Sequence, residues 1–182
     1  MSLKEKALTF ATKMHEGQMR KANSRPYIVH PIEVSKILEA ANLEESVVIA
    51  GLLHDTVENT PATIEEIASL FGEEVAVLVA AHTEDKSRSW EERKTHTIEV
   101  VKKGTLPLKA LIAADKLSNL KSLQESYEEQ GEEVWTHFKR GYEKQKWYYL
   151  NVAHNLFIGL KEEEVPAFFY KFRKETEIFF DK

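Results

Sequence analysis

The stretch that decides the fold is an apolar run that ends in polar side chains, and it reads Gly51-Leu52-Leu53-His54-Asp55-Thr56-Val57-Glu58-Asn59-Thr60. On a helix, residues three and four positions apart share a face. If the helix continues, it therefore aims His54, Asp55 and Glu58 toward one point. A neutral imidazole beside a carboxylate suits a divalent transition metal, and a free carboxylate nearby can move protons. His-Asp alone is a weak signal, so the hypothesis of a metal site depends on ligands elsewhere in the chain.

The residues before His54 indicate that this pair lies in the interior. The predicted helix from Glu44 to Leu53 is apolar nearly all round, which is typical of a buried helix. An unpaired ionised Asp55 at that depth would cost several kcal/mol. A metal ion is one way to compensate the charge, and an arginine partner is another.

Two other segments offer ligands. His30 precedes Pro31, which suits the first turn of a helix and so places His30 where that helix begins. Asp115 ends a second apolar run, and Asn119 and Ser122 follow it at i+4 and i+7 on one polar stripe. The stripe indicates either a network of buried polar groups or a metal site that Asp115 completes, with Asn119 and Ser122 orienting water or substrate.

Length and composition narrow the class of protein. With 182 residues and a hydrophobic fraction of 42%, the chain suits one domain with a real core. It has no cysteine, which excludes thiolate chemistry and fits a reducing compartment, so we expect a cytoplasmic protein. The net charge of -5 argues against general nucleic-acid binding. No apolar run approaches the roughly 20 residues that span a bilayer, so we expect no membrane association.

Apolar residues recur at three- and four-residue spacing along nearly the whole chain, and strand alternation is missing. The sequence therefore predicts an all-α fold. Beyond Gly131 the spacing of aromatic residues predicts one long amphipathic helix, and Val165-Pro166 precedes a last one. Such an aromatic stripe is typical of a core or of a self-association surface, and the second reading would make the protein a homo-oligomer.

Cationic residues gather in two places. The connection between residues 18 and 27 carries Arg20 and Lys21, which fit either a solvated loop or a clamp that reaches phosphate oxygens. A second group of cations consists of Lys86, Arg88, Arg93 and Lys94. We expect most of this group to be solvated, with one or two members closing over an anionic ligand. We expect His82, just before this group, to be a surface or packed histidine rather than a ligand.

The order of the candidate ligands, with His30 first, then His54-Asp55, then Asp115, resembles the HD phosphohydrolase superfamily. Within it the chain is similar to the alarmone hydrolases, which are the hydrolase domains of bifunctional (p)ppGpp synthetase/hydrolases and their small single-domain relatives. The matching segments lie within residues 5–125, and they are Gln18 with Arg20-Lys21, Pro26-Tyr27-Ile28-Val29-His30-Pro31, Leu52-Leu53-His54-Asp55-Thr56-Val57-Glu58, Phe71-Gly72, Thr83 with Asp85-Lys86, and Ala114-Asp115-Lys116-Leu117-Ser118-Asn119-Leu120.

The resemblance implies a single HD-domain helical bundle of residues 1–182, with a core of residues 1–125 and C-terminal helices in 131–182 packed on it. It also implies one divalent ion, usually manganese in this family, and removal of the 3′-pyrophosphate from the nucleotide ppGpp or pppGpp. By position, the metal ligands would be His30, His54, Asp55 and Asp115. The catalytic carboxylate would be Glu58, with Asn59 beside it, and the substrate-binding candidates would be Arg20, Lys21, Lys86, Asn119 and Ser122.

The chain departs from the family at Asn59, where the family usually has Asp. Asn cannot exchange a proton, so turnover should fall if the Glu-Asp pair shares the work of a base, or else the substrate differs. One alternative is therefore an HD hydrolase of another nucleotide or phosphate monoester. A second is a non-catalytic helical module that binds nucleotide. A dinuclear oxygenase is the third, and it would need His82 and His96 as extra ligands. Glu84, before Asp85, is a smaller departure.

Overall fold

The computed structural model describes residues 1–21 and 23–181, and in these ranges the chain forms helices and connections but no β-strand, apart from one isolated bridge between Met19 and Pro26. The helices are α1 Leu3–Met14, α2 Val29–Ala40, α3 Glu45–Leu53, α4 Thr56–Asn59, α5 Ile64–Phe71, α6 Glu73–His82, α7 Trp90–Lys103, α8 Leu106–Gln130, the 3-10 helix η1 Gly131–His137, α9 Gly141–Asn155, the 3-10 helix η2 Glu162–Glu164 and α10 Ala167–Phe180. The prediction of an all-α fold is confirmed.

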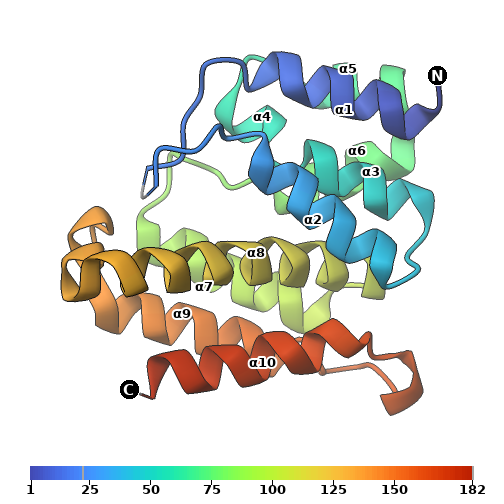
Figure 1. Ribbon diagram of the computed structural model, residues 1–182. Coiled ribbons are helices and arrows are strands. Elements are labelled where there is room, and N and C mark those ends of the chain that lie inside the picture. Colours follow the sequence, from blue (N-terminus) through green and yellow to red (C-terminus); the bar gives the residue numbers. More distant parts are fainter. Residues whose placement is uncertain (22, 182) are drawn as a thin grey trace.

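Helix α8 crosses the middle of the molecule (Figure 1). Helices α2, α3 and α6 pack against it from one side, and α9 and α10 lie on the other (Figure 1). Its buried residues run from Lys109 to Ser126 and include Asp115 and Ser118. Because α8 is enclosed in this way, its polar side chains must find partners inside the protein.

Helices α2 and α3 pack very closely, and Gly51 makes this approach possible. A Cβ atom on Gly51 would lie 2.8 Å from Leu38 Cδ1 and 3.1 Å from Ser35 Cα. The Ser35 hydroxyl donates to the carbonyl of Val48 at 3.1 Å, which adds a polar contact between the same two helices. This packing matters for function because His30 lies in α2 and His54 directly follows α3.

The region after α8 forms two helices rather than the single long one that the sequence predicts, so that prediction is wrong. The 3-10 helix η1 ends at His137, and α9 begins only at Gly141. Gly131 and Gly141 adopt positive φ angles of 61° and 67°, a left-handed conformation that interrupts a right-handed helix. Apolar spacing alone does not reveal such a break, because each of the two helices buries aromatic residues, such as Trp135 in η1 and Tyr149 in α9.

The last helix follows Pro166, as predicted. Phe169, Phe172 and Phe180 of α10 are fully buried, and α10 packs on α8 and α9, whereas Ile178 is 57% exposed and does not belong to the inward stripe. One continuous cluster of buried hydrophobic residues joins the N-terminal and C-terminal helices. That residues 1–182 form a single HD domain stays a prediction. No helix in the described ranges is both long and apolar enough to cross a membrane.

Candidate metal centre and active site

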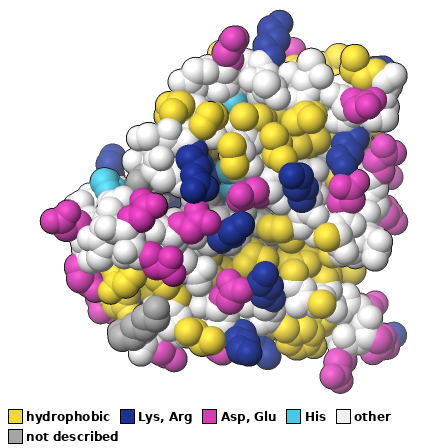
Figure 2. All heavy atoms as spheres, viewed as in Figure 1, with side chains coloured by type: hydrophobic (Ala, Val, Ile, Leu, Met, Phe, Trp, Pro, Cys, Tyr) yellow, Lys and Arg dark blue, Asp and Glu magenta, His cyan; other side chains and the backbone are white. Residues whose placement is uncertain are grey.

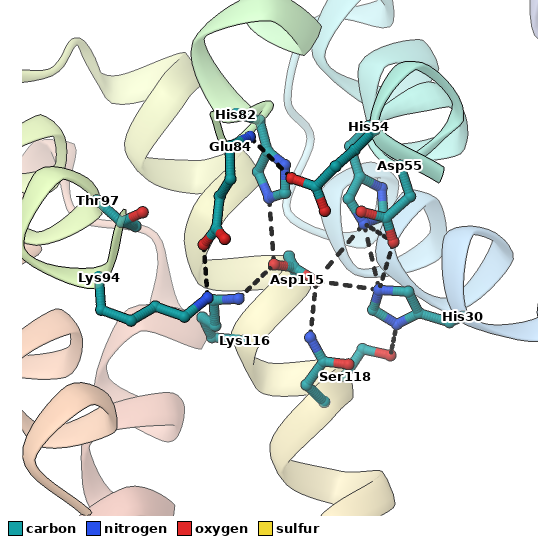
Figure 3. A network of polar contacts seen from close by, with 12 residues as sticks. His30, His54, Asp55, His82, Glu84, Lys94, Thr97, Asp115, Lys116 and Ser118 are labelled. Atoms are coloured by element: carbon teal, nitrogen blue, oxygen red, sulfur yellow. Dashed lines mark hydrogen bonds and ion pairs between the residues drawn. The ribbon is translucent and has the colours of Figure 1, made fainter. Parts of the chain in front are cut away.

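Four side chains from three distant segments of the sequence meet at α8, which supplies one of them, Asp115 (Figure 3). His30 Nε2 lies 3.2 Å from His54 Nε2 and 3.0 Å from Asp115 Oδ1. His54 Nε2 lies 3.1 Å from Asp55 Oδ2 and 3.5 Å from Asp115 Oδ1. His30, His54 and Asp115 each offer a ligand atom, and these atoms all lie within 4.8 Å of one another. The structure thus brings together the four residues predicted as ligands, with Asp55 next to the two imidazoles.

Hydrogen bonds behind the two histidines aim their Nε2 atoms inward. His54 Nδ1 donates to the Gly51 carbonyl at 2.8 Å. His30 Nδ1 lies 3.0 Å from Ser118 Oγ, which itself donates to Glu33 Oε2 at 2.9 Å, so His30 Nδ1 is the donor in its contact. Outer partners of this kind fix the tautomer of metal-binding histidines. In the neutral form, both Nε2 lone pairs therefore face the same point.

The charges at this point fit a bound cation. Burial opposes protonation of His54, but Asp55 and Asp115 outweigh it and raise the pKa of His54 to about 10. Burial lowers the pKa of His30. The two carboxylates therefore favour a positive charge beside the two imidazoles. A divalent ion bound to the nitrogen and oxygen donors would supply this charge in place of a proton. The donor set is suitable for one divalent metal ion.

Tyr27 also belongs to the centre, although sequence reasoning assigned it no role. Its hydroxyl donates to Asp55 Oδ2 at 2.6 Å. Burial and the neighbouring Asp55 raise the pKa of Tyr27 well above its usual value, so the hydroxyl keeps its proton and remains a donor. Tyr27 precedes His30 by three positions, and this helical spacing is the signal that points to it.

Asp115 is held by side chains on both of its oxygens. Asn119 Nδ2 donates to Oδ1 at 2.9 Å, while His82 Nε2 and Lys116 Nζ lie 3.1 Å and 2.9 Å from Oδ2. Burial opposes ionisation of Asp115, but Lys116 and the histidines keep its pKa well below the usual value. His82 is half-buried, and that it is not a metal ligand stays a prediction. Lys116, which follows Asp115 directly, is a functional candidate that sequence reasoning missed.

Glu58 does not lie on a continuous extension of α3. That helix ends at Leu53, and a separate short helix, α4, begins at Thr56, whose hydroxyl donates to the Leu53 carbonyl at 2.7 Å. The assumption of a continuing helix is therefore wrong. Glu58 and Asp55 nevertheless line the same cavity.

The loop after α6 holds Glu58 and Asn59 in place. The backbone N–H of Glu84 donates to Glu58 Oε1 at 2.8 Å. Lys86 Nζ donates to the Glu58 carbonyl at 2.7 Å and to Asn59 Oδ1 at 3.2 Å. Lys86 thus lies beside the site, and its side chain contacts that of Asn59.

A cavity of about 320 Å³ opens beside these residues. It is bounded by side chains from α4, α6, α7, α8 and α9, and its cationic members are Arg88, Arg93, Lys94 and Lys116. Arg93 and Lys94 are 24% and 16% exposed and both pair with Glu84. Lys86 and Arg88 are exposed, whereas α7 turns Arg93 and Lys94 toward the cavity, as Figure 3 shows for Lys94. That one or two members of this group close over an anionic ligand stays a prediction.

The other candidates for substrate binding lie in two groups. Arg20 Nη2 donates to Asn119 Oδ1 at 3.0 Å, and Asn119 also lines the cavity. Ser122 accepts a hydrogen bond from Asn23 Nδ2 at 3.2 Å and lies in a separate small hollow with Arg20. Lys21 is exposed on the loop surface. Of the five predicted residues, Asn119 and Lys86 are the two that contact the centre or Glu58 directly.

The HD domain family profile matches residues 7–142 of this chain. The chain belongs to the HD domain family. The guanosine-3′,5′-bis(diphosphate) 3′-pyrophosphohydrolase MESH1 of Drosophila melanogaster is 44% identical over 120 residues, which is 64% of this HD protein and 67% of the fly protein.

Solved structures share the fold of this HD protein. One is the crystal structure of a Listeria monocytogenes protein, whose sequence is 50% identical to this one. The two structures superpose with a TM-score of 0.81, and the aligned part covers 84% of this chain and 99% of the Listeria chain. A second structure, described as a metazoan ortholog of SpoT that hydrolyses ppGpp and plays a role in starvation responses, is 32% identical, has a TM-score of 0.79, and covers 98% of this chain and 95% of its own. The resemblance inferred from the motifs is confirmed.

Proposed function

We propose that this protein is a metal-dependent hydrolase that removes the 3′-pyrophosphate from ppGpp or pppGpp and leaves GDP or GTP. The observation that carries the proposal is the cluster of the His30, His54 and Asp115 donors, in which Asp115 also lines a cavity that carries basic side chains. The fly relative is named as this enzyme, and the metazoan relative is described as hydrolysing ppGpp. An anionic nucleotide suits a cavity that combines cations with a metal site.

His30, His54, Asp55 and Asp115 would hold the metal ion, which we propose is manganese. Mixed imidazole and carboxylate donors, with positions left for water or substrate, are compatible with that ion. When bound, such an ion polarises a phosphoryl group and counters its developing negative charge.

Glu58 would take the proton of the attacking water. Its Oε1 accepts from the Glu84 N–H, which fixes the carboxylate at the cavity wall and leaves Oε2 as a proton acceptor. The water oxygen attacks the phosphorus that is bonded to the ribose 3′-oxygen, and the bond between that phosphorus and the 3′-oxygen breaks. Pyrophosphate is released, and the 3′-oxygen takes up a proton to become the 3′-hydroxyl of GDP or GTP. Arg20, Lys21 and Lys86 on the loops, Asn119 and Ser122 on α8, and the cations of the cavity would bind the nucleotide's phosphate and sugar groups.

Incubation of the manganese-loaded protein with ppGpp tests the function. We expect release of pyrophosphate and GDP, and loss of at least about a hundredfold in rate in Glu58→Gln because that variant lacks a proton acceptor. Glu99→Gln, which changes a partly exposed residue of α7 outside the cavity, is the matched control. A wild-type protein that contains its metal and releases no pyrophosphate would contradict the proposal.

Asn59 supports a second candidate function, hydrolysis of another nucleotide or phosphate monoester. Asn59 lines the cavity and its side chain accepts from Lys86, whereas an Asp there would be charged. A screen of phosphate esters distinguishes the two functions. Orthophosphate release from monoesters, without pyrophosphate release from ppGpp, would favour this candidate.

We propose a cytoplasmic protein that acts on a small molecule rather than on nucleic acid. Acidic and basic side chains are interspersed over the face shown in Figure 2, whereas nucleic-acid binding favours a basic stripe. Self-association into a homo-oligomer stays a prediction, and a measurement of molar mass in solution tests it.

A further inference from the structure

Glu84 places a carboxylate directly against two cations of the cavity. Its Oε1 lies 2.5 Å from Lys94 Nζ, and its Oε2 lies 2.7 Å from Arg93 Nη1 (Figure 3 shows the Lys94 contact). The Glu84 side chain is only 15% exposed, so water screens these ion pairs weakly. Each carboxylate oxygen is thus taken by one cation that faces the proposed substrate site.

Polar atoms around these ion pairs still lack partners. Arg93 Nε and the Tyr148 hydroxyl are buried and have no hydrogen-bond partner within the described residues. Both residues line the cavity. A buried donor without an acceptor costs free energy, so this wall of the cavity is suited to a ligand that brings acceptor oxygens.

Residue 84 connects this wall to the proposed catalytic carboxylate. Its side chain pairs with Arg93 and Lys94, while its backbone N–H donates to Glu58 Oε1. It lies in the connection between α6 and α7, outside any helix. Rotation of the Glu84 side chain can therefore release the cations without breaking the hydrogen bond to Glu58.

We propose that Glu84 is an internal counter-anion, which a phosphate group of the substrate displaces from Arg93 and Lys94. This inference rests on the proposed function and adds a source of selectivity to it. A phosphate group carries up to two negative charges and three acceptor oxygens, so it competes with one carboxylate for both cations. A neutral or weakly charged ligand does not compensate the free energy lost when the ion pairs of Glu84 with Arg93 and Lys94 break. Glu84 is thus a positioning residue that favours polyanionic substrates.

Binding of inorganic pyrophosphate to the manganese-loaded protein tests the inference without any turnover of ppGpp. Glu84→Gln keeps the size of the side chain and the backbone N–H but removes the negative charge. By calorimetry we expect this variant to bind pyrophosphate about three- to tenfold more tightly than the wild type. Glu91→Gln removes the same charge from a partly exposed residue of α7 that pairs with Arg140, and it should bind as the wild type does. Unchanged or weaker binding by folded Glu84→Gln overturns the inference.

Kinetics with ppGpp separate this role from a structural one. If Glu84 competes with substrate, the KM of Glu84→Gln falls and kcat stays within about twofold of the wild type. A lower kcat with an unchanged KM would instead make Glu84 a support for Glu58 and would overturn the inference. A protein that fails to hydrolyse ppGpp removes the proposed function but leaves the pyrophosphate experiment valid.

A structure of the wild-type protein with manganese and pyrophosphate gives a test that needs no variant. The inference expects a ligand phosphate on Arg93 and Lys94, with the Glu84 carboxylate more than about 4 Å from Lys94 Nζ, beyond ion-pair distance. Pyrophosphate bound in the cavity while Glu84 keeps both ion pairs would overturn it.

Discussion

Ser118 lies behind His30 and has no place among the four proposed ligands. Its Oγ contacts His30 Nδ1 at 3.0 Å and Glu33 Oε2 at 2.9 Å, so a series of hydrogen bonds runs from His30 through Ser118 to Glu33. Single residues of this kind set the orientation of a donor and the energy of placing an ion on it. At the scale of single residues, we therefore expect effects on the affinity of the site for a metal ion and on the number of protons that the ion displaces.

Ser118→Ala should lower the affinity for Mn²⁺ by about ten- to a hundredfold, because His30 loses the partner that fixes its ring. Titration calorimetry of the metal-free protein measures this affinity. Ser126→Ala is the matched control, since Ser126 is buried on the same helix and its hydroxyl has no partner within the described residues. Equal affinities in the two variants would show that Ser118 does not orient His30.

Metal binding should release about one proton per ion near pH 7. The pKa of His54 is raised to about 10 by its carboxylate neighbours despite burial, so the metal-free site is protonated at neutral pH. The ion must displace that proton from Nε2, and affinity should therefore rise with pH between 6 and 8. Calorimetry in buffers of different ionisation enthalpy counts the protons. Heats independent of buffer, or affinity that falls with rising pH, would contradict this.

At the scale of elements, the centre depends on how closely α2 and α3 approach. His30 is near the start of one helix and His54 follows the end of the other, and both are positioned by packing on α8. Gly51 is the point of closest approach, because a side chain there would overlap Leu38. Helix packing and donor geometry are thus coupled.

Gly51→Ala should reduce the free energy of unfolding by about 1–3 kcal/mol, the usual cost of overpacking a well-packed core. It should also weaken Mn²⁺ binding, since it moves α2 relative to α3. Urea unfolding of the metal-free protein measures the first effect, and calorimetry the second. Ser69→Ala, at an exposed position of α5, should change neither. Unaltered stability of Gly51→Ala would mean that the two helices have room to separate.

At the scale of the whole molecule, the C-terminal helices complete both the core and the cavity. Tyr148 of α9 lines the cavity, and Phe169 and Phe172 of α10 belong to the same hydrophobic cluster as the residues around the centre. The metal centre and this C-terminal layer therefore share one core through α8. If residues 1–182 are a single domain, they should unfold together.

Mn²⁺ should raise the midpoint of thermal unfolding equally when tryptophan fluorescence and far-ultraviolet circular dichroism follow the transition. The tryptophans are Trp90, Trp135 and Trp147, none of which is a proposed ligand. At an ion concentration 100 times the Kd, the added stability should be about 2.7 kcal/mol. His30→Ala, which lacks a donor, should not respond. If Mn²⁺ leaves the midpoint followed by fluorescence unchanged but raises the midpoint followed by circular dichroism, the C-terminal helices unfold separately. That result would contradict the single-domain prediction.

The sequence by itself determined the helical fold and the identity of the four side chains proposed as metal ligands. Both follow from local patterns, because helical periodicity is visible within a few turns and a polar residue such as Asp115 is conspicuous at the end of an apolar run. The family motif then indicated that His30, His54, Asp55 and Asp115 belong together, although their role as ligands is still a proposal.

Only the tertiary structure decided what surrounds those residues. Arg93 and Lys94 look like solvated cations in the sequence, yet α7 places them in the cavity against Glu84. The break before Gly141 and the contact of Ser118 with His30 were equally invisible. The physical reason is that burial and ion pairing depend on elements that are distant in the sequence. The residues next to a side chain in the sequence therefore do not reveal its burial or its ion-pair partners.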